Sequence, residues 1–292
     1  MDFTLENFIY VDKTVYIPQL VKLKRVFISR PRRFGKSLTL DTIATLFETG
    51  VEPYFKGTWI YDKWTEPTYP VLRLNFLNFD KNSLEKFNNK LNSKITEFAE
   101  LNQVTTYKEK EEAEDSIDHL LEQLRLEGRQ IVILIDEYDC QMTANINNET
   151  LYKQFQEKIK SFYANIKDKF AIKFLGITGV TRLKDVSIFS VGSDIRDITN
   201  SSAYSQMIGF TRDEIKKFYI DYLKLAASYE NNCSVDDVTD TQIESLLDRL
   251  AQNYDGYCFD EDYEKKVFST WSVNKFFQTM IEKKKVQFGE YW

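Results

Sequence analysis

The chain has 292 residues, and its 39 lysines and arginines against 45 aspartates and glutamates give a formal charge of −6 at pH 7. A hydrophobic content of 42% is enough for a substantial core, which excludes a wholly disordered chain. The single histidine, His119, excludes a histidine-based metal site and a Ser-His-Asp triad. The acidic balance gives no strong nucleic-acid signal, and no apolar run approaches the ~20 residues of a membrane-spanning helix.

The cysteines and the first residues of the chain bear on its compartment. Cys140, Cys233 and Cys258 are odd in number and too far apart for a CxxC pair, which predicts reduced thiols in a cytoplasmic protein. The start, MDFTLENFIYVDKT, is acidic and lacks the basic region and the apolar run of a signal peptide. We therefore expect neither a secretory leader nor a membrane span.

Strands and helices are expected to alternate over the first two thirds of the chain. The strand candidates are short apolar runs, at 26–29, 71–76, 131–135 and 172–177. The helix candidates repeat apolar residues at spacings of three and four, over 36–48, 84–98, 117–124 and 151–166. One strand, IVILI, is apolar throughout, as in strands buried on both faces of a parallel sheet. The alternation predicts right-handed βαβ crossovers and an α/β fold, a parallel sheet flanked by helices.

The pattern changes near Thr211. Helical spacing recurs over 215–223, 243–250 and 273–280, and only the short segments YCFD and KVFS between them are expected to be extended. We therefore predict an α/β core over residues 1–210 and a mainly helical lid over residues 211–292. The aromatic residues of the lid are expected to form its core or an interface: Tyr254, Tyr257, Phe259, Trp271, Phe276 and Phe277.

The segment FISRPRRFGKSLTL (27–40) is expected to run from a strand through a loop into a helix, with Gly35, Lys36 and Ser37 at the helix entrance. At such a position the backbone N–H groups and the positive end of the helix dipole face an anion. A lysine there reaches the β- and γ-phosphates of a nucleotide, and a neighbouring hydroxyl binds Mg²⁺. The spacing therefore predicts a phosphate-binding loop.

Arg30 departs from the pattern G-x-x-x-x-G-K-[ST], which has glycine at that position. Pro31 compensates in part, because its ring presets φ for a tight bend. Arg30, Arg32 and Arg33 either add charge-assisted hydrogen bonds to phosphate or lie on a solvated basic face.

An acidic pair, Asp136 and Glu137, ends the apolar strand at 131–135. The carboxyl end of a buried strand is where a second phosphate-handling motif belongs. Asp136 is expected to hold the Mg²⁺ water shell, and Glu137 to orient or deprotonate the attacking water. The alternative is a strand that ends in two helix-capping acids.

A third element, FLGITGVTRLKDVSIFS (174–190), turns at Gly179 after its strand. Thr178 is placed to touch the γ-phosphate or the attacking water. Arg182, or Arg196 further on, could stabilise the charge that develops in the transition state. The alternative for each arginine is an ordinary pair with a surface carboxylate.

The chain resembles the bacterial AAA-ATPase-like proteins of the P-loop NTPase superfamily. The strings that carry the resemblance run in order over almost the whole chain: YVDKT, SRPRRFGKSLTL, ILIDEYD, ITGVTR, VSIFS, RDIT, IGFT and YDGYCF. The phosphate loop of these relatives typically reads RPRRFGKS, so Arg30 is shared with them. One departure is VGSDIRDIT (191–199), where relatives usually have a glycine-asparagine-leucine stretch.

The resemblance implies a set of ligands and site residues. ATP is expected on the loop residues Arg30, Pro31, Arg32, Arg33, Phe34, Gly35, Lys36 and Ser37. Mg²⁺ is expected at Ser37 and Asp136, with Glu137 as the catalytic base. Asp12 and Lys13, in the segment YVDKT, are expected near the base or ribose.

Three functions stay open from the sequence. The first is an active ATPase that acts as a switch or remodelling module of a larger protein; the second is a nucleotide-gated interaction module with little hydrolysis. A cysteine hydrolase built on Cys140 is the third, and it lacks a general base other than His119. The expected partners are a second copy of the chain, which could supply an arginine, or a protein that binds the lid. Relatives commonly continue beyond a segment like FGEYW (288–292) into a restriction-endonuclease-like domain. The resemblance implies either a fragment, with a truncated lid and a fused nuclease domain beyond Trp292, or a chain that has lost its nuclease portion. We predict no nuclease activity for residues 1–292.

Overall fold

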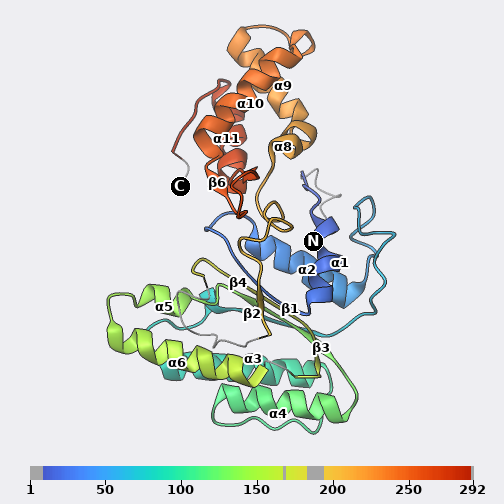
Figure 1. Ribbon diagram of the computed structural model, residues 1–292, viewed down its shortest axis with the longest axis vertical. Coiled ribbons are helices and arrows are strands. Elements are labelled where there is room, and N and C mark those ends of the chain that lie inside the picture. Colours follow the sequence, from blue (N-terminus) through green and yellow to red (C-terminus); the bar gives the residue numbers. More distant parts are fainter. Residues whose placement is uncertain (1–8, 167–168, 183–193, 291–292) are drawn as a thin grey trace. The chain divides into compact units, whose positions relative to one another are not determined.

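The computed structural model describes residues 9–166, 169–182 and 194–290 (Figure 1). By internal packing the chain forms two compact units. The sheet unit comprises residues Tyr16–Pro31 and Lys36–Ile198, and the helical unit comprises Met1–Val15, Arg32–Gly35 and Thr199–Trp292. The short segment Arg32–Gly35 of the predicted phosphate loop thus packs with the helical unit.

The sheet unit contains a five-stranded parallel sheet in the order β2-β3-β4-β1-β5. The strands are β1 (Arg25–Ser29), β2 (Val71–Asn75), β3 (Ile131–Asp136), β4 (Ile172–Gly179) and β5 (Arg196–Asp197). Every residue of β3 is buried, which agrees with a central strand covered on both faces. The predicted parallel α/β fold is confirmed.

Helices cover both faces of this sheet (Figure 1). One face carries α3 (Leu84–Leu101), α4 (Ala113–Leu126) and α6 (Glu149–Ile166), and the other carries α1 (Ile17–Leu23) and α2 (Lys36–Thr49). A short helix, α5 (Cys140–Ala144), follows β3. The apolar stripes of α3, α4 and α6, including Phe87, Leu120 and Phe162, form one continuous core with the sheet.

The helical unit is built from four helices among its described residues. They are α8 (Arg212–Phe218), α9 (Ile220–Asn231), α10 (Asp240–Tyr254) and α11 (Thr270–Lys283), with an antiparallel ribbon of β6 (Tyr257–Cys258) and β7 (Lys266–Val267). Capping boxes begin α8 at Thr211 and α10 at Thr239, which fixes where these helices start. Phe276, Phe277 and their apolar neighbours form the core of the unit.

The expected helices and strands between residues 26 and 177 are present, and α8, α9, α10 and α11 follow Thr211. The predicted domain bounds, 1–210 and 211–292, stay a prediction. Among the described α-helices and strands, three have no counterpart among the predictions: α1, α5 and the two-residue strand β5. The segment VSIFS and the first residues of VGSDIRDIT lie outside the described residues. In the part of the chain that the structure covers, none of the helices has the length and apolarity needed to cross a bilayer.

Candidate functional site

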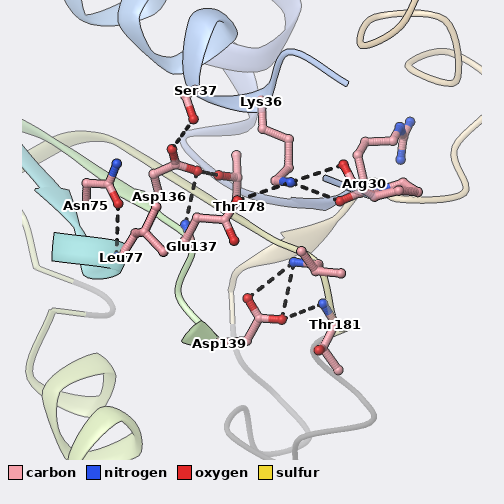
Figure 2. A network of polar contacts seen from close by, with 12 residues as sticks. Arg30, Lys36, Ser37, Asn75, Leu77, Asp136, Glu137, Asp139, Thr178 and Thr181 are labelled. Carbon is pink, nitrogen blue, oxygen red and sulfur yellow. Dashed lines mark hydrogen bonds and ion pairs between the residues drawn. The ribbon is translucent and has the colours of Figure 1, made fainter. Parts of the chain in front are cut away.

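The carboxyl ends of four neighbouring strands lie at one edge of the sheet. Ser29 at the end of β1 pairs with Gly179 of β4, and Asn75 at the end of β2 pairs with Asp136 of β3. In open parallel sheets this edge is where ligands bind. The sequence motifs that the strands carry therefore converge in space (Figure 2).

Asp136 is the buried centre of this edge. Its carboxylate accepts hydrogen bonds from the Ser37 hydroxyl at 2.5 Å, from the Thr178 hydroxyl at 2.5 Å and from the Glu137 backbone N–H at 3.0 Å. These donors come from α2, from β4 and from the turn after β3. The structure thus brings together Ser37, Asp136 and Thr178 as the sequence motifs predict.

The oxygen atoms around Asp136 fit a magnesium ion. A carboxylate and hydroxyl oxygens are hard ligands of the kind that Mg²⁺ takes in phosphate-handling sites, where substrate phosphates and water complete the octahedron. The Ser37 oxygen keeps its lone pairs for a metal while its O–H group donates a hydrogen bond to the Asp136 carboxylate. No group of three or more His, Cys, Asp or Glu side chains gathers as a metal site among the residues described.

Lys36 opens α2 and is 4% exposed. Its ammonium group donates to the carbonyl oxygens of Arg30 at 3.1 Å and Pro31 at 3.2 Å, and lies 3.3 Å from Glu137 Oε1 (Figure 2). A buried ammonium is stable only when anions or acceptors surround it. The loop carbonyls and Glu137 supply these, so the cation is held at the entrance of the helix.

Glu137 has a left-handed backbone, with φ of 52°. A residue other than glycine pays for this conformation with about 1–3 kcal/mol of strain, which typically persists at functional sites. The turn directs the Glu137 side chain toward Lys36 while Asp136 stays at the strand end. The two neighbouring acids thus face different partners.

Arg30 is 1% exposed and its Nη1 donates to the Ser29 carbonyl at 2.8 Å. Burial lowers the pKa of its guanidinium to about 9; Asp197 opposes this and Arg182 adds to it. The group therefore stays charged at pH 7. Asp197 lies on β5 and Arg182 in the loop after β4, so the Arg30 side chain interacts within the sheet unit.

The family model that describes a predicted AAA-ATPase matches residues 1–189. The chain belongs to this AAA-ATPase-like family. Membership supports ATP binding by a P-loop fold, and the loop RPRRFGKS and the pair Asp136–Glu137 both lie within the matched region.

A curated relative and two solved structures are similar to the chain. An uncharacterized protein in the vnfD 5′ region of Azotobacter chroococcum mcd 1 is 33% identical over 242 residues, covering 74% of this chain and 45% of that protein. The chain thus spans less than half the length of this relative. Cdc6p from Pyrobaculum aerophilum matches with 13% identity and a TM-score of 0.42, over 99% of this chain and 68% of that one. The ORC2 protein of Aeropyrum pernix, in ADPNP–ADP complexes, matches with 12% identity and a TM-score of 0.31, over 84% and 70%.

Within this AAA-ATPase-like chain, the middle of the predicted phosphate loop, Arg32–Gly35, packs in the helical unit. The Arg33 carbonyl accepts hydrogen bonds from Thr270 Oγ1 at 2.9 Å and Trp271 N at 3.2 Å, at the start of α11. The Arg33 guanidinium lies 4.8 Å from the centroid of the Trp271 ring. Phe34 is buried edge-on against Tyr257, with ring centroids 4.6 Å apart. The Arg33 and Phe34 side chains thus make protein contacts, although Arg33, like Arg32, is exposed.

Asp12 and Lys13 also lie in the helical unit. Asp12 caps its own turn by accepting from Thr14 N at 2.9 Å. Lys13 donates to Glu214 at 2.6 Å and to the Gln206 carbonyl at 2.7 Å. Burial lowers the pKa of Lys13 against the opposing effect of Glu214. Both side chains are thus engaged inside the unit, and their contact with a base or ribose stays a prediction.

The two candidate arginines have different positions in the sheet unit. Arg182 is half-buried and directly follows the turn after β4. Arg196 is exposed on β5 and pairs with Val26, near the start of β1 and away from its carboxyl end. The structure therefore brings Arg182, and not Arg196, to the edge where Asp136 lies.

Asn75 is a residue of this edge that sequence analysis did not select. Its Oδ1 accepts a hydrogen bond from Leu77 N at 3.0 Å (Figure 2). It also lines a pocket of about 390 Å³ together with Ser37, Asp136 and Arg73. The signal was available, because Asn75 is the polar residue that ends the strand VLRLN. Tyr138 and Asp139, in the segment ILIDEYD, also had no role predicted from sequence.

The alternative of a cysteine hydrolase finds no support at Cys140. Burial raises the pKa of its thiol, which disfavours the reactive thiolate. His119 Nδ1 accepts a hydrogen bond from Lys108 N at 3.3 Å, and its ring lies 6.0 Å from that of Tyr107. The partners expected from sequence, including self-association and a fused nuclease domain, stay predictions.

Proposed function

We propose that this chain binds Mg²⁺–ATP at Lys36, Ser37 and Asp136 and hydrolyses it with Glu137 as the general base. The observation that carries the proposal is the network around Asp136, in which hydroxyls from α2 and β4 meet one carboxylate beside the Lys36–Glu137 pair. This is the donor set that P-loop ATPases need for a phosphate chain and its metal.

ATP would enter this site as a competitor for Lys36. The ammonium group is held by Glu137 at 3.3 Å and by two loop carbonyls, and phosphate oxygens are stronger partners for it. Transfer of Lys36 to phosphate frees the Glu137 carboxylate to accept a proton from water. The Lys36–Glu137 ion pair thus couples ATP binding to release of the Glu137 carboxylate.

The remaining groups have distinct tasks in this proposal. When bound at Ser37 and Asp136, Mg²⁺ supplies charge neutralisation of the phosphates. Thr178 fixes the Asp136 carboxylate and lies where it can orient a phosphate oxygen or the attacking water. Arg182 is the candidate for stabilising transition-state charge. The loop residues Arg32–Gly35, with Asp12 and Lys13, remain predicted nucleotide contacts. Arg196 remains the predicted alternative to Arg182 for stabilising transition-state charge.

Calorimetric titration with Mg²⁺–ATP, together with phosphate release in the same samples, tests the proposal. Lys36→Ala is expected to lose both binding and release. Lys22→Ala, an exposed lysine on α1, is the matched control and is expected to keep both. Binding without release in the wild type would instead support the nucleotide-gated module, and no binding would overturn the assignment of the site.

A further inference from the structure

Two residues that follow the acidic pair hold the loop after β4. Asp139 is 2% exposed, and its carboxylate accepts from the backbone N–H groups of Val180 at 3.2 Å and Thr181 at 2.6 Å. Among the described residues it has no ion pair with a lysine or arginine. The Val180 and Thr181 amides therefore supply the hydrogen bonds of this buried carboxylate (Figure 2). Hydrogen bonds to a charged acceptor are stronger than neutral ones, so the carboxylate restrains the backbone of the loop.

Tyr138 holds the same loop through the carbonyl group of Thr181. Its hydroxyl donates to the Thr181 carbonyl at 3.1 Å, and its backbone N–H donates to the Thr178 carbonyl at 3.1 Å. Thr181 thus has its N–H on Asp139 and its carbonyl on Tyr138. Both polar groups of one peptide segment are fixed by two consecutive side chains.

The Tyr138 ring is buried completely and leaves no room for a side chain at Gly179. A Cβ atom built there would lie 2.3 Å from Tyr138 Cδ1. The ring also packs edge-on against Phe27 of β1, with centroids 5.2 Å apart. The contact therefore joins β1, the turn after β3 and the end of β4 into one rigid arrangement.

The loop that is held in this way connects two residues of the proposed mechanism. It begins next to Thr178, whose hydroxyl lies on Asp136, and leads to Arg182, which acts electrostatically on Arg30. Tyr138 and Asp139 directly follow Glu137, whose backbone is left-handed, and both bond Thr181 beyond the end of β4. The position of Arg182 relative to the acidic pair thus depends on two side chains that need not touch the nucleotide.

We propose that Tyr138 and Asp139 are positioning residues for ATP hydrolysis, which fix the loop 180–182 and so hold Arg182 in place relative to Asp136 and Glu137. The inference rests on the proposed function. Misplacing a catalytic group by about 1 Å costs on the order of 10²-fold in rate, so loss of this clamp is expected to lower kcat. The affinity for ATP is expected to stay within about twofold, because Lys36 bonds the Arg30 and Pro31 carbonyls and Ser37 bonds Asp136, and none of these bonds is altered.

Asp139→Asn and Tyr138→Phe test the inference with minimal change in volume. Each is expected to lower kcat, Asp139→Asn by about 10–100-fold and Tyr138→Phe by less, since only one hydrogen bond is lost. Calorimetric titration measures ATP affinity in the same preparations, and thermal unfolding verifies that each variant is folded. Hydrogen exchange of the Val180 and Thr181 amides is expected to accelerate in Asp139→Asn.

A double-mutant cycle with Arg182→Ala separates positioning from a general loss of structure. If Asp139 acts through Arg182, the Asp139→Asn change has little further effect on kcat once Arg182 is absent. Additive effects, or an unchanged kcat in Asp139→Asn beside an active wild type, would overturn the inference alone. If the wild type shows no turnover that depends on Glu137, the proposed function fails, and the positioning role falls with it.

Discussion

Lys36 Nζ lies 3.3 Å from Glu137 Oε1, so the residue expected to bind phosphate and the residue expected to activate water form an ion pair with each other. Both side chains are largely buried, where a charge that loses its partner is strongly destabilised. The pair therefore stabilises the ligand-free site and sets a condition for catalysis, because each group must exchange its partner before it can act.

Glu137→Gln is expected to abolish hydrolysis while strengthening ATP binding. The amide cannot accept the proton of the attacking water, and its neutral side chain no longer competes with phosphate for the Lys36 ammonium. We expect turnover to fall by about 10²-fold or more and the Kd for ATP to fall by a few-fold. Phosphate release and calorimetry measure the two quantities. Weaker binding in the variant would show that Glu137 does not compete for Lys36.

Ser37→Ala is expected to reduce the strengthening of ATP binding by Mg²⁺. The change removes one predicted metal ligand and also one of the three hydrogen bonds to Asp136. We expect the ratio of ATP affinities with Mg²⁺ and with a chelator to fall by about tenfold, as for the loss of groups that hold a metal site. Thr42→Ala is the matched control, because the Thr42 hydroxyl bonds the Leu38 carbonyl in the same helix at 2.8 Å. An equal ratio in wild type and Ser37→Ala would exclude Ser37 from the metal site.

Gly179→Ala is expected to destabilise the sheet unit. The added methyl group would overlap the Tyr138 ring, whose Cε1 atom would lie 2.5 Å away, and Asp139 Oδ1 would lie at 2.7 Å. Overpacking of this kind typically costs about 1–3 kcal/mol of unfolding free energy. Gly256→Ala is the control, since a Cβ there meets no atom within 4 Å. Urea unfolding measures both variants, and an equal stability would mean that the Tyr138 ring can move at little cost.

The sequence predicts those parts of the fold and site that depend on local pattern. The buried strand IVILI, the helix that follows Gly35 and the acids at the end of β3 are each specified by consecutive residues. Strand β5 is not predictable in this way, because its two residues become a strand only by pairing with Val26 and Phe27.

Contacts between residues far apart in the chain account for the rest. Arg33 and Phe34 lie in a basic, phosphate-type motif, yet Arg33 bonds the start of α11, 237 residues away in sequence. The segment ILIDEYD likewise gives no sign that Asp139 differs from its acidic neighbours. Its role depends on the loop after β4, which the fold brings within hydrogen-bond distance. No spacing rule along the chain specifies such partners.

Glu214→Gln is expected to destabilise the helical unit in a pH-dependent manner. Glutamine can keep the capping contact with Thr211 N, but Lys13 loses its countercharge. For a partly exposed pair we expect a loss of about 1–3 kcal/mol near pH 7, below the range for fully buried pairs. Asp213→Asn, an exposed acid in the same turn of α8, is the control and should change stability by only a few tenths of a kcal/mol.

The sign of the pH dependence follows from the pKa of Lys13. Burial lowers this pKa in the folded protein, and removal of Glu214 lowers it further. Between the lowered pKa and the ordinary pKa of lysine, the unfolded chain binds more protons than the folded one, so stability rises with pH in that window. The deficit of Glu214→Gln is therefore full at neutral pH and shrinks as alkaline pH is approached. Urea unfolding of wild type and variant at a series of pH values measures it, and a deficit that grows with pH would contradict the assignment to Lys13.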